Sequence, residues 1–154
     1  MPDSTILYPL LIIFAGALAA ALAGVPALRP IFSAQRLGLL LAAAPLAAFI
    51  LLLEFVPPLQ ANLVYTWQVN WLPAAGLTAG LYLDSLSALF ALLITFIGTL
   101  VLIYAGQYFK NDTGAWRFFT YILLFMGAML GLVLAGDVIT LFIFWEGTSL
   151  VSFL

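Results

Sequence analysis

The sequence predicts an all-α integral membrane protein with about five transmembrane helices. Of its 154 residues, 66% are hydrophobic and 6% are charged, whereas a soluble domain carries about a quarter charged residues. The mean hydropathy is +1.25, and long stretches without a charged side chain recur, as spans of roughly 20 apolar residues require. We therefore expect a single membrane domain over residues 1–154, with helices at about 6–25, 37–56, 85–108, 117–135 and 138–154.

The first predicted helix, residues 6–25, carries small side chains at every fourth position. Gly16, Ala20 and Gly24 form this stripe. Small residues at that spacing let a neighbouring helix approach closely. We therefore expect the stripe to face another helix.

The second predicted helix, residues 37–56, contains Pro45. A proline inside a helix kinks it or frees a carbonyl group that a neighbour must satisfy. Pro57 and Pro58 follow directly and are expected to end this helix.

The segment 57–83 changes in composition without gaining charge. Residues 63–71 alternate with period two, and residues 74–77 are typical of a turn before a second extended piece. This pattern predicts a β-hairpin. Because Trp and Tyr favour the membrane–water interface, its aromatic side chains indicate an external hairpin between the second and third helices.

The third and fifth predicted helices each follow an aspartate, Asp84 and Asp137. A carboxylate at that position can accept hydrogen bonds from the first free N–H groups as an N-cap. Both aspartates are also candidates to support an ion path, so the two interpretations stay open. In the fourth helix, Gly127 and Gly131 form a second small-residue pair that favours helix packing.

The four basic residues indicate the orientation in the membrane. Arg29 and Arg36 lie between the first two helices, and Lys110 and Arg117 lie between the third and fourth. Alternating helices put both loops on one face, which the positive-inside rule assigns to the cytoplasm. The N-terminus and the hairpin are then outside, and the chain is a multi-pass protein of the cell (inner) membrane.

Missing residue types exclude several kinds of site. The sequence contains no cysteine and no histidine, which removes disulfides, thiolate metal sites, cysteine nucleophiles and histidine ligands. We therefore expect no cofactor and no metal site. The net charge of −2 gives no reason to expect nucleic acid as a partner.

Glu146 is the acidic residue placed well inside a predicted span. At 1.5 Å per residue it lies about 12 Å beyond Val138, in a hydrocarbon core about 30 Å thick. An ionised carboxylate facing lipid at that depth costs several kcal/mol. Glu146 should therefore face protein or water and be paired or protonated, which makes it the candidate proton-transfer residue.

Two hydroxyl side chains are candidates to support Glu146. Ser149 shares its helical face at i+3, and Thr148 adds a second hydroxyl. Hydroxyl groups beside a carboxylate suit a proton relay, but they also suit ordinary helix packing. A structural Glu146 that only hydrogen-bonds a neighbouring helix is the competing interpretation, and Glu54 is read as a solvated end charge.

Two segments resemble the large A subunit of Mrp-type multi-subunit Na+/H+ antiporters. Residues 144–154 (FWEGTSLVSFL) are similar to its Trp-Glu-Leu-Thr-Ser segment, and residues 82–90 (YLDSLSALF), with the residues up to Tyr104, are similar to its third helix. The same region resembles the antiporter-like membrane subunits of respiratory complex I, whose segment often reads Trp-Glu-Gly, as it does here with Gly147. The resemblance covers roughly residues 71–154.

This resemblance implies a larger fold of two inverted five-helix repeats, in which a fifth-helix Glu pairs with a Lys of the seventh helix. By that correspondence Glu146 is the fifth-helix Glu, and its Lys partner lies outside this chain, which we expect to be a fragment of a longer subunit. The implied function is proton-coupled Na+/H+ exchange in a hetero-oligomeric complex. The implied partners are other membrane subunits, protons, monovalent cations and lipid.

Two other functions remain open at this point. The first is a proton-pumping membrane subunit of a complex I-type NADH:quinone oxidoreductase, which would make the chain part of a translocase. The second is a small structural membrane subunit without a transport role. In the antiporter interpretation the chain is a transporter subunit and not an enzyme.

Overall fold

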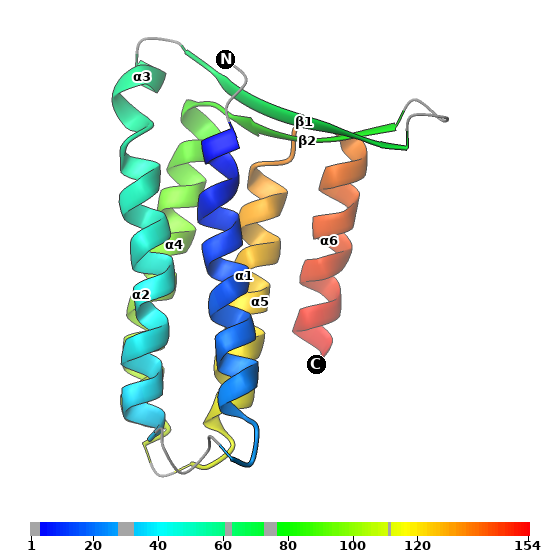
Figure 1. Cartoon of the computed structure of the whole chain (residues 1–154). Helices are drawn as coiled ribbons and strands as arrows, with labels where there is room; N and C mark the ends of the chain where they lie inside the picture. The colour runs from blue at the N-terminus through cyan, green and yellow to red at the C-terminus, as the bar shows by residue number, and fades with distance from the viewer. Residues whose placement is uncertain (1–3, 28–32, 61–62, 73–76, 111) are drawn as a thin grey trace.

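The computed structural model describes residues 4–27, 33–60, 63–72, 77–110 and 112–154. A short 3₁₀ turn (η1) opens the described chain, and helices and a pair of strands follow it (Figure 1). In order, the elements are η1 (Ser4–Ile6), α1 (Leu7–Ala23), α2 (Ala34–Leu53), α3 (Val56–Gln60), β1 (Tyr65–Leu72), β2 (Leu77–Leu83), α4 (Ser85–Tyr108), α5 (Ala115–Val133) and α6 (Val138–Phe153).

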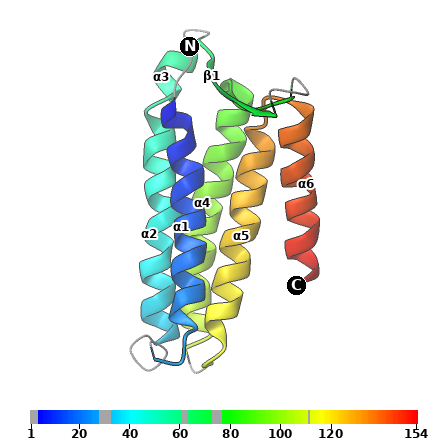
Figure 2. The ribbon, with the colours of Figure 1, turned by 45° about the vertical axis from the view of Figure 1, so that its right-hand side comes forward.

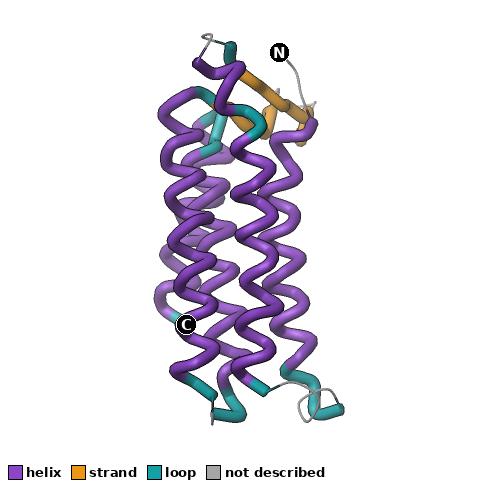
Figure 3. Tube along the Cα trace, turned by 90° about the vertical axis from the view of Figure 1, so that its left-hand side faces the viewer, coloured by secondary structure: helices purple, strands orange, loops and turns teal. Residues whose placement is uncertain are grey.

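The long helices stand side by side and run alternately down and up the bundle (Figure 1). α1 packs against α2 and α5, and α2 makes its most extensive contact with α4. α6 lies at the edge of the bundle, next to α5 (Figure 2). The strands are confined to one end of the helices (Figure 3), so the α1–α2 and α4–α5 connections share the opposite end.

The end opposite the strands carries positive charge. Arg36 lies at the start of α2, Lys110 follows α4 and Arg117 lies at the start of α5. These three basic residues therefore share one end of the bundle, as the loop pattern predicts, while Arg29 lies outside the described residues. The assignment of this end to the cytoplasm, with the N-terminus outside, stays a prediction.

Membrane-spanning length is reached by four helical segments of the described chain. They are Ser4–Ala23, Ala34–Leu53, Ser85–Tyr108 and Ala115–Val133. α6 is apolar but has 16 residues, about 24 Å at 1.5 Å per residue against a hydrocarbon core of about 30 Å. The prediction of a mostly helical chain with apolar helices that suit a membrane is confirmed.

The predicted end of the second helix at Pro57 and Pro58 is wrong. α2 ends earlier, at Leu53, and the prolines lie in the first turn of the short helix α3. Between the two helices, the N–H groups of Glu54 and Phe55 bond carbonyls three residues back. Because the first N–H groups of a helix have no intrahelical acceptor, prolines in that turn cost no hydrogen bond.

The strands β1 and β2 pair antiparallel, from Tyr65 opposite Leu83 to Leu72 opposite Leu77, with an irregular register near Leu72. Leu81 and Leu83 of β2 are buried, and Tyr82 between them is exposed. Alternation of this kind puts one face of the strand pair onto the ends of the helices. The predicted turn at 74–77 lies outside the described residues, apart from Leu77.

The segment between α5 and α6 adds to the free edge of β2. The Tyr82 N–H donates to the Leu134 carbonyl (2.7 Å), and the Gly136 N–H donates to the Gly80 carbonyl (2.8 Å). Leu81 and Ala135 form an isolated antiparallel bridge between these two bonds. The strand pair is therefore joined to the chain segment that leads into α6.

Small residues allow the closest helix contacts. A Cβ added at Gly38 of α2 would lie 2.7 Å from the Gly106 Cα and 2.9 Å from the Leu102 carbonyl oxygen, both in the backbone of α4. A Cβ at Gly16, in the predicted stripe on α1, would lie 2.9 Å from the Ala44 Cβ of α2. Glycine is required at Gly38 because backbone atoms cannot rotate out of the way.

The other predicted small-residue positions face aromatic rings. Gly127 of α5 lies against the Phe14 ring of α1, and Gly131 of α5 lies against the Phe144 ring of α6. The Trp116 ring occupies the space beside Gly24. The small-residue pairs therefore do face neighbouring elements, but most of them receive a large side chain there.

Candidate functional site

The candidate site lies on α6, which is the least covered of the long helices (Figure 2). This helix packs mainly against α5 and touches β2 at its start. Thr140 is its buried residue. Large hydrophobic side chains of this helix are exposed, namely Val138, Leu141, Phe142, Ile143, Trp145, Leu150 and Phe153.

Glu146 lies near the middle of α6 and is exposed. In the described part of the chain, no hydrogen bond or ion pair reaches its carboxylate. Phe144 and Gly147 contact Gly131 and Ala128 of α5, and a helix turns about 100° per residue. The carboxylate of Glu146 consequently points away from α5, toward the outside of the bundle.

The two hydroxyl residues near Glu146 are arranged differently. Thr148 donates its hydroxyl to the Trp145 carbonyl (2.7 Å), a bond within its own helix, and its carbonyl accepts the Ser152 hydroxyl (2.5 Å). Ser149 is exposed, like Glu146. Ser149 is therefore the hydroxyl that shares the open face with the carboxylate.

A hydrogen-bonded cluster joins the start of α6 to β2. The Asp137 carboxylate accepts hydrogen bonds from the Thr140 backbone N–H (2.8 Å) and the Thr140 hydroxyl (2.9 Å). The same hydroxyl oxygen accepts a bond from the Gly80 N–H of β2 (3.0 Å). The N-cap prediction for Asp137 is confirmed. Thr140 is a further member that was not predicted, although the Asp-x-x-Thr spacing before an apolar run is a capping signal that points to it.

Asp84 caps α4 in the same way. Its carboxylate accepts a hydrogen bond from the Ser87 N–H (2.8 Å), and the Ser87 hydroxyl oxygen accepts one from the Asp84 N–H (2.8 Å). This reciprocal capping box satisfies two N–H groups at once. Its presence confirms the N-cap prediction for Asp84.

Both aspartates are held ionised at the helix starts. Burial acts to raise the pKa of Asp137, but hydrogen bonds from Thr140, Gly80 and Ile139 outweigh it and put the pKa below its usual 3.8. The hydrogen bond from the Ser87 N–H is the main cause that lowers the pKa of Asp84 below 3.8. Carboxylates of this kind hold no proton at neutral pH, which favours their role as caps.

The structure keeps these aspartates apart from Glu146. α4 and α6 both begin at the end of the bundle that carries the strands (Figure 1). Glu146 lies about 13 Å further along α6 than Asp137, at 1.5 Å per residue. Of the predicted site residues, Ser149 therefore shares a face of α6 with Glu146, whereas the Thr148 hydroxyl is bonded within the helix.

Replacing Asp84 with Ala should lower the free energy of unfolding by about 1 kcal/mol, because one N-terminal N–H group of α4 loses its acceptor. Titration of the purified protein with SDS in mixed micelles measures this loss at neutral pH. The control is Asp84→Asn, which retains an acceptor oxygen and should lose less.

The difference between wild type and Asp84→Ala should depend on pH. The folded-state pKa of Asp84 lies below 3.8, so its charge-dependent stabilisation is present above that value and is lost as the pH falls through the folded pKa. A difference that stays constant down to the lowest pH measured would contradict this account of the cap.

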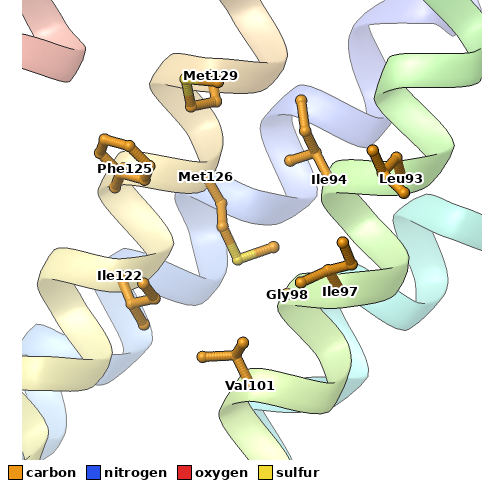
Figure 4. A pocket seen from close by; sticks show the side chains of 9 residues that line it. All are labelled: Leu93, Ile94, Ile97, Gly98, Val101, Ile122, Phe125, Met126 and Met129. Carbon is orange, nitrogen blue, oxygen red and sulfur yellow. The ribbon is translucent and has the colours of Figure 1, made fainter.

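An apolar pocket of about 250 Å³ lies between α4 and α5 (Figure 4). Met126 reaches from α5 toward Gly98 of α4, where an added Cβ would collide with its side chain. The residues that line the pocket carry no ionisable group; among them are Leu93, Ile97, Val101, Ile122, Phe125 and Met129. This pocket therefore offers no group for proton transfer.

Comparisons with known proteins find similarity to a complex I family and to antiporter A1 subunits. Residues 71–119 match the family described as NADH-ubiquinone oxidoreductase (complex I), chain 5 N-terminus. The chain is 42% identical over 130 residues to the Na(+)/H(+) antiporter subunit A1 of Staphylococcus haemolyticus (strain JCSC1435) and 41% identical over 130 residues to that of Staphylococcus aureus. Each alignment covers 84% of this chain and 16% of the relative.

A solved structure shows the same relationship. The chain is similar to one in the structure of the Mrp complex from Dietzia sp. DQ12-45-1b, with a TM-score of 0.77 and 32% sequence identity. This match covers 97% of the present chain and 15% of that chain. The present chain thus spans about one sixth of the length of these relatives.

Proposed function

We propose that the chain is part of a proton-translocating antiporter-like subunit, because it is similar to the A1 subunits of Na+/H+ antiporters and because residues 71–119 match the complex I chain 5 N-terminal family. In this proposal it serves the exchange of protons for Na+ within a multi-subunit membrane complex. The complex lies in the cell membrane, with the end that carries Arg36, Lys110 and Arg117 in the cytoplasm.

The observation that carries this proposal is the position and exposure of the Glu146 carboxylate. It is a carboxylate near the middle of an apolar helix, exposed, and without a bonding partner in the described residues. A carboxylate in that position cannot stay ionised against lipid. It needs either a proton or a cationic partner, and alternation between these two states is what a proton-coupled exchanger requires.

The mechanism proposed for Glu146 has two states. In one state the carboxyl is protonated, and in the other it is ionised and paired with a lysine from a helix outside this chain. Exchange of the proton for the ion pair changes the charge at mid-membrane depth, and movement of the pair opens or closes the proton route. Ser149, on the same open face, is placed to donate a hydrogen bond to the ionised form.

A second candidate is a complex I-type proton-pumping subunit, which the family model over residues 71–119 favours. In that case the same carboxylate would respond to quinone chemistry in a distant arm of the complex. The two candidates differ in what drives proton movement, a cation gradient in one and electron transfer in the other.

Everted membrane vesicles that contain the native complex separate the two candidates. A proton gradient is first formed, and its collapse on addition of Na+ is followed with a pH-sensitive dye. Collapse that depends on Na+, without quinone reduction or bound redox groups, supports the antiporter. Proton movement that requires electron transfer to a quinone supports the second candidate. A complex that shows neither response contradicts both candidates.

A further inference from the structure

The start of α6 is attached to the strand pair through one buried hydroxyl. Thr140 is 6% exposed, and its hydroxyl donates to Asp137 while its oxygen accepts from the Gly80 N–H. Gly80 is itself bonded to Gly136 through its carbonyl (2.8 Å). Thr140 is therefore the side chain of α6 that connects this helix directly to β2.

This connection determines how α6 is rotated about its axis. Thr140 and Glu146 are separated by a rise of about 9 Å and by a rotation of about 240°, at 100° per residue. Because a helix is stiff over this length, a hydroxyl held on two sides sets the direction in which the carboxylate points. Packing of Phe144 and Gly147 on α5 holds this orientation further along the helix, and the Thr140 bond to Gly80 holds it at the start of α6.

We propose that Thr140 is a positioning residue for Glu146: its hydroxyl attaches α6 to the strand pair and holds the carboxylate on the open face, away from α5. This inference rests on the proposed function, because it gives Thr140 a role in proton exchange through Glu146. The strand pair acts in it as the fixed support against which α6 is oriented.

The chemistry requires a hydroxyl and not only a side chain of this size. A hydroxyl donates and accepts at the same time, as it does here between the Asp137 carboxylate and the Gly80 N–H. Valine has the same shape but does neither, and it would remove the bond between the Thr140 oxygen and the buried Gly80 N–H, leaving that group only the Asp137 carboxylate. Serine restores both bonds and removes only a methyl group.

The test compares Thr140→Val with Thr140→Ser in the assembled complex. The matched control is Thr99→Val on α4, because Thr99 is also 6% exposed but donates its hydroxyl only to the Thr95 carbonyl of its own helix (2.8 Å). Exchange is measured as Na+-dependent collapse of a proton gradient. We expect Thr140→Val to reduce its rate about tenfold, with Thr140→Ser and Thr99→Val close to wild type.

A second measurement reports the position of α6 directly. The chain has no cysteine, so single cysteines can be introduced at Val69 of β1 and Leu150 of α6, both exposed, and spin-labelled for distance measurement. Thr140→Val should broaden or shift the distance distribution, and the serine variant should restore it. A merely structural role of Thr140 would lower the amount of complex without changing this distance in the complex that forms.

The outcomes separate the two hypotheses. Unchanged exchange in Thr140→Val, or lost exchange with an unchanged distance distribution, overturns the positioning role. If Thr140→Val fails to assemble, Thr140→Ala is measured in its place. If both variants fail to assemble while Thr140→Ser assembles, the hydroxyl acts in folding, and this result also overturns the proposal. If the wild-type complex shows no exchange, the proposed function is wrong. The distance between the labels at positions 69 and 150 still tests whether Thr140 attaches α6 to the strand pair.

Discussion

Replacing Glu146 with Gln is expected to reduce Na+-dependent proton exchange by the assembled complex about 100-fold or more, the range seen when a proton-transferring side chain is lost. Glutamine has the same shape and fills the same place on α6, but it neither binds nor releases a proton and carries no charge for a lysine partner. The rate of Na+-dependent gradient collapse in everted vesicles measures the effect. Glu146→Asp retains the carboxyl and should retain part of the rate.

The matched control for this change is Glu54→Gln. Glu54 is also exposed but lies at the end of α2, where water or the membrane interface can solvate it. A complex that carries Glu54→Gln should therefore exchange protons for Na+ at the wild-type rate. If Glu146→Gln exchanged like Glu54→Gln in complexes of equal abundance, the two-state mechanism at Glu146 would be wrong, and the interpretation of this carboxylate as a packing group would take its place.

Replacing Gly38 with Leu is expected to lower the free energy of unfolding by about 3 kcal/mol, the upper part of the range for overpacked sites. The added Cβ alone would lie 2.7 Å from the Gly106 Cα and 2.9 Å from the Leu102 carbonyl oxygen. Because both atoms belong to the backbone, α2 and α4 must move apart, and they form the most extensive helix contact of the bundle. Titration with SDS measures the loss.

A pair of identical changes isolates this steric effect. Gly38→Ala and Gly147→Ala both replace a helical glycine, and alanine by itself favours the helix by about 1 kcal/mol. A Cβ at Gly147 meets only the Ala128 Cβ at 3.4 Å, so Gly147→Ala should leave the stability unchanged or raise it. Gly38→Ala should lower it. Equal effects of the two changes would contradict the close contact of α2 with α4.

Local sequence patterns predicted the helices well. The third predicted helix, 85–108, coincides with α4, and the others differ by a few residues at their ends. Hydropathy over a span and a capping aspartate are properties of neighbouring residues, so they can be read without knowing the fold. The same locality explains why Asp84 and Asp137 were predicted as N-caps.

The end of α2 was predicted less well. Two consecutive prolines normally interrupt a helix, but α2 had already ended at Leu53, and the prolines fall in the first turn of α3. There the missing N–H groups have no cost. The sequence pattern indicated that a helix ends near these residues, but not that α2 ends before the prolines and that α3 contains them.

The candidate site was predicted only in part. Glu146 stands out because a charge in an apolar run is visible in the sequence itself. The attachment of Thr140 to Gly80 joins residues that are 60 positions apart, and no local pattern indicates which strand edge a helix start will meet. Thr140 was not predicted, and the Asp-x-x-Thr spacing before α6 could have indicated its bond to Asp137 but not its bond to Gly80.

The sequence by itself determined the membrane class of this chain, the position of its apolar helices, the candidacy of Asp84 and Asp137 as caps, and the presence of a carboxylate far inside α6. Tertiary structure decided that Gly38 meets the backbone of α4, that the segment after α5 pairs with β2, and that Glu146 faces away from α5. The physical reason is that hydropathy and capping act between near neighbours, whereas helix rotation and approach depend on packing between distant segments.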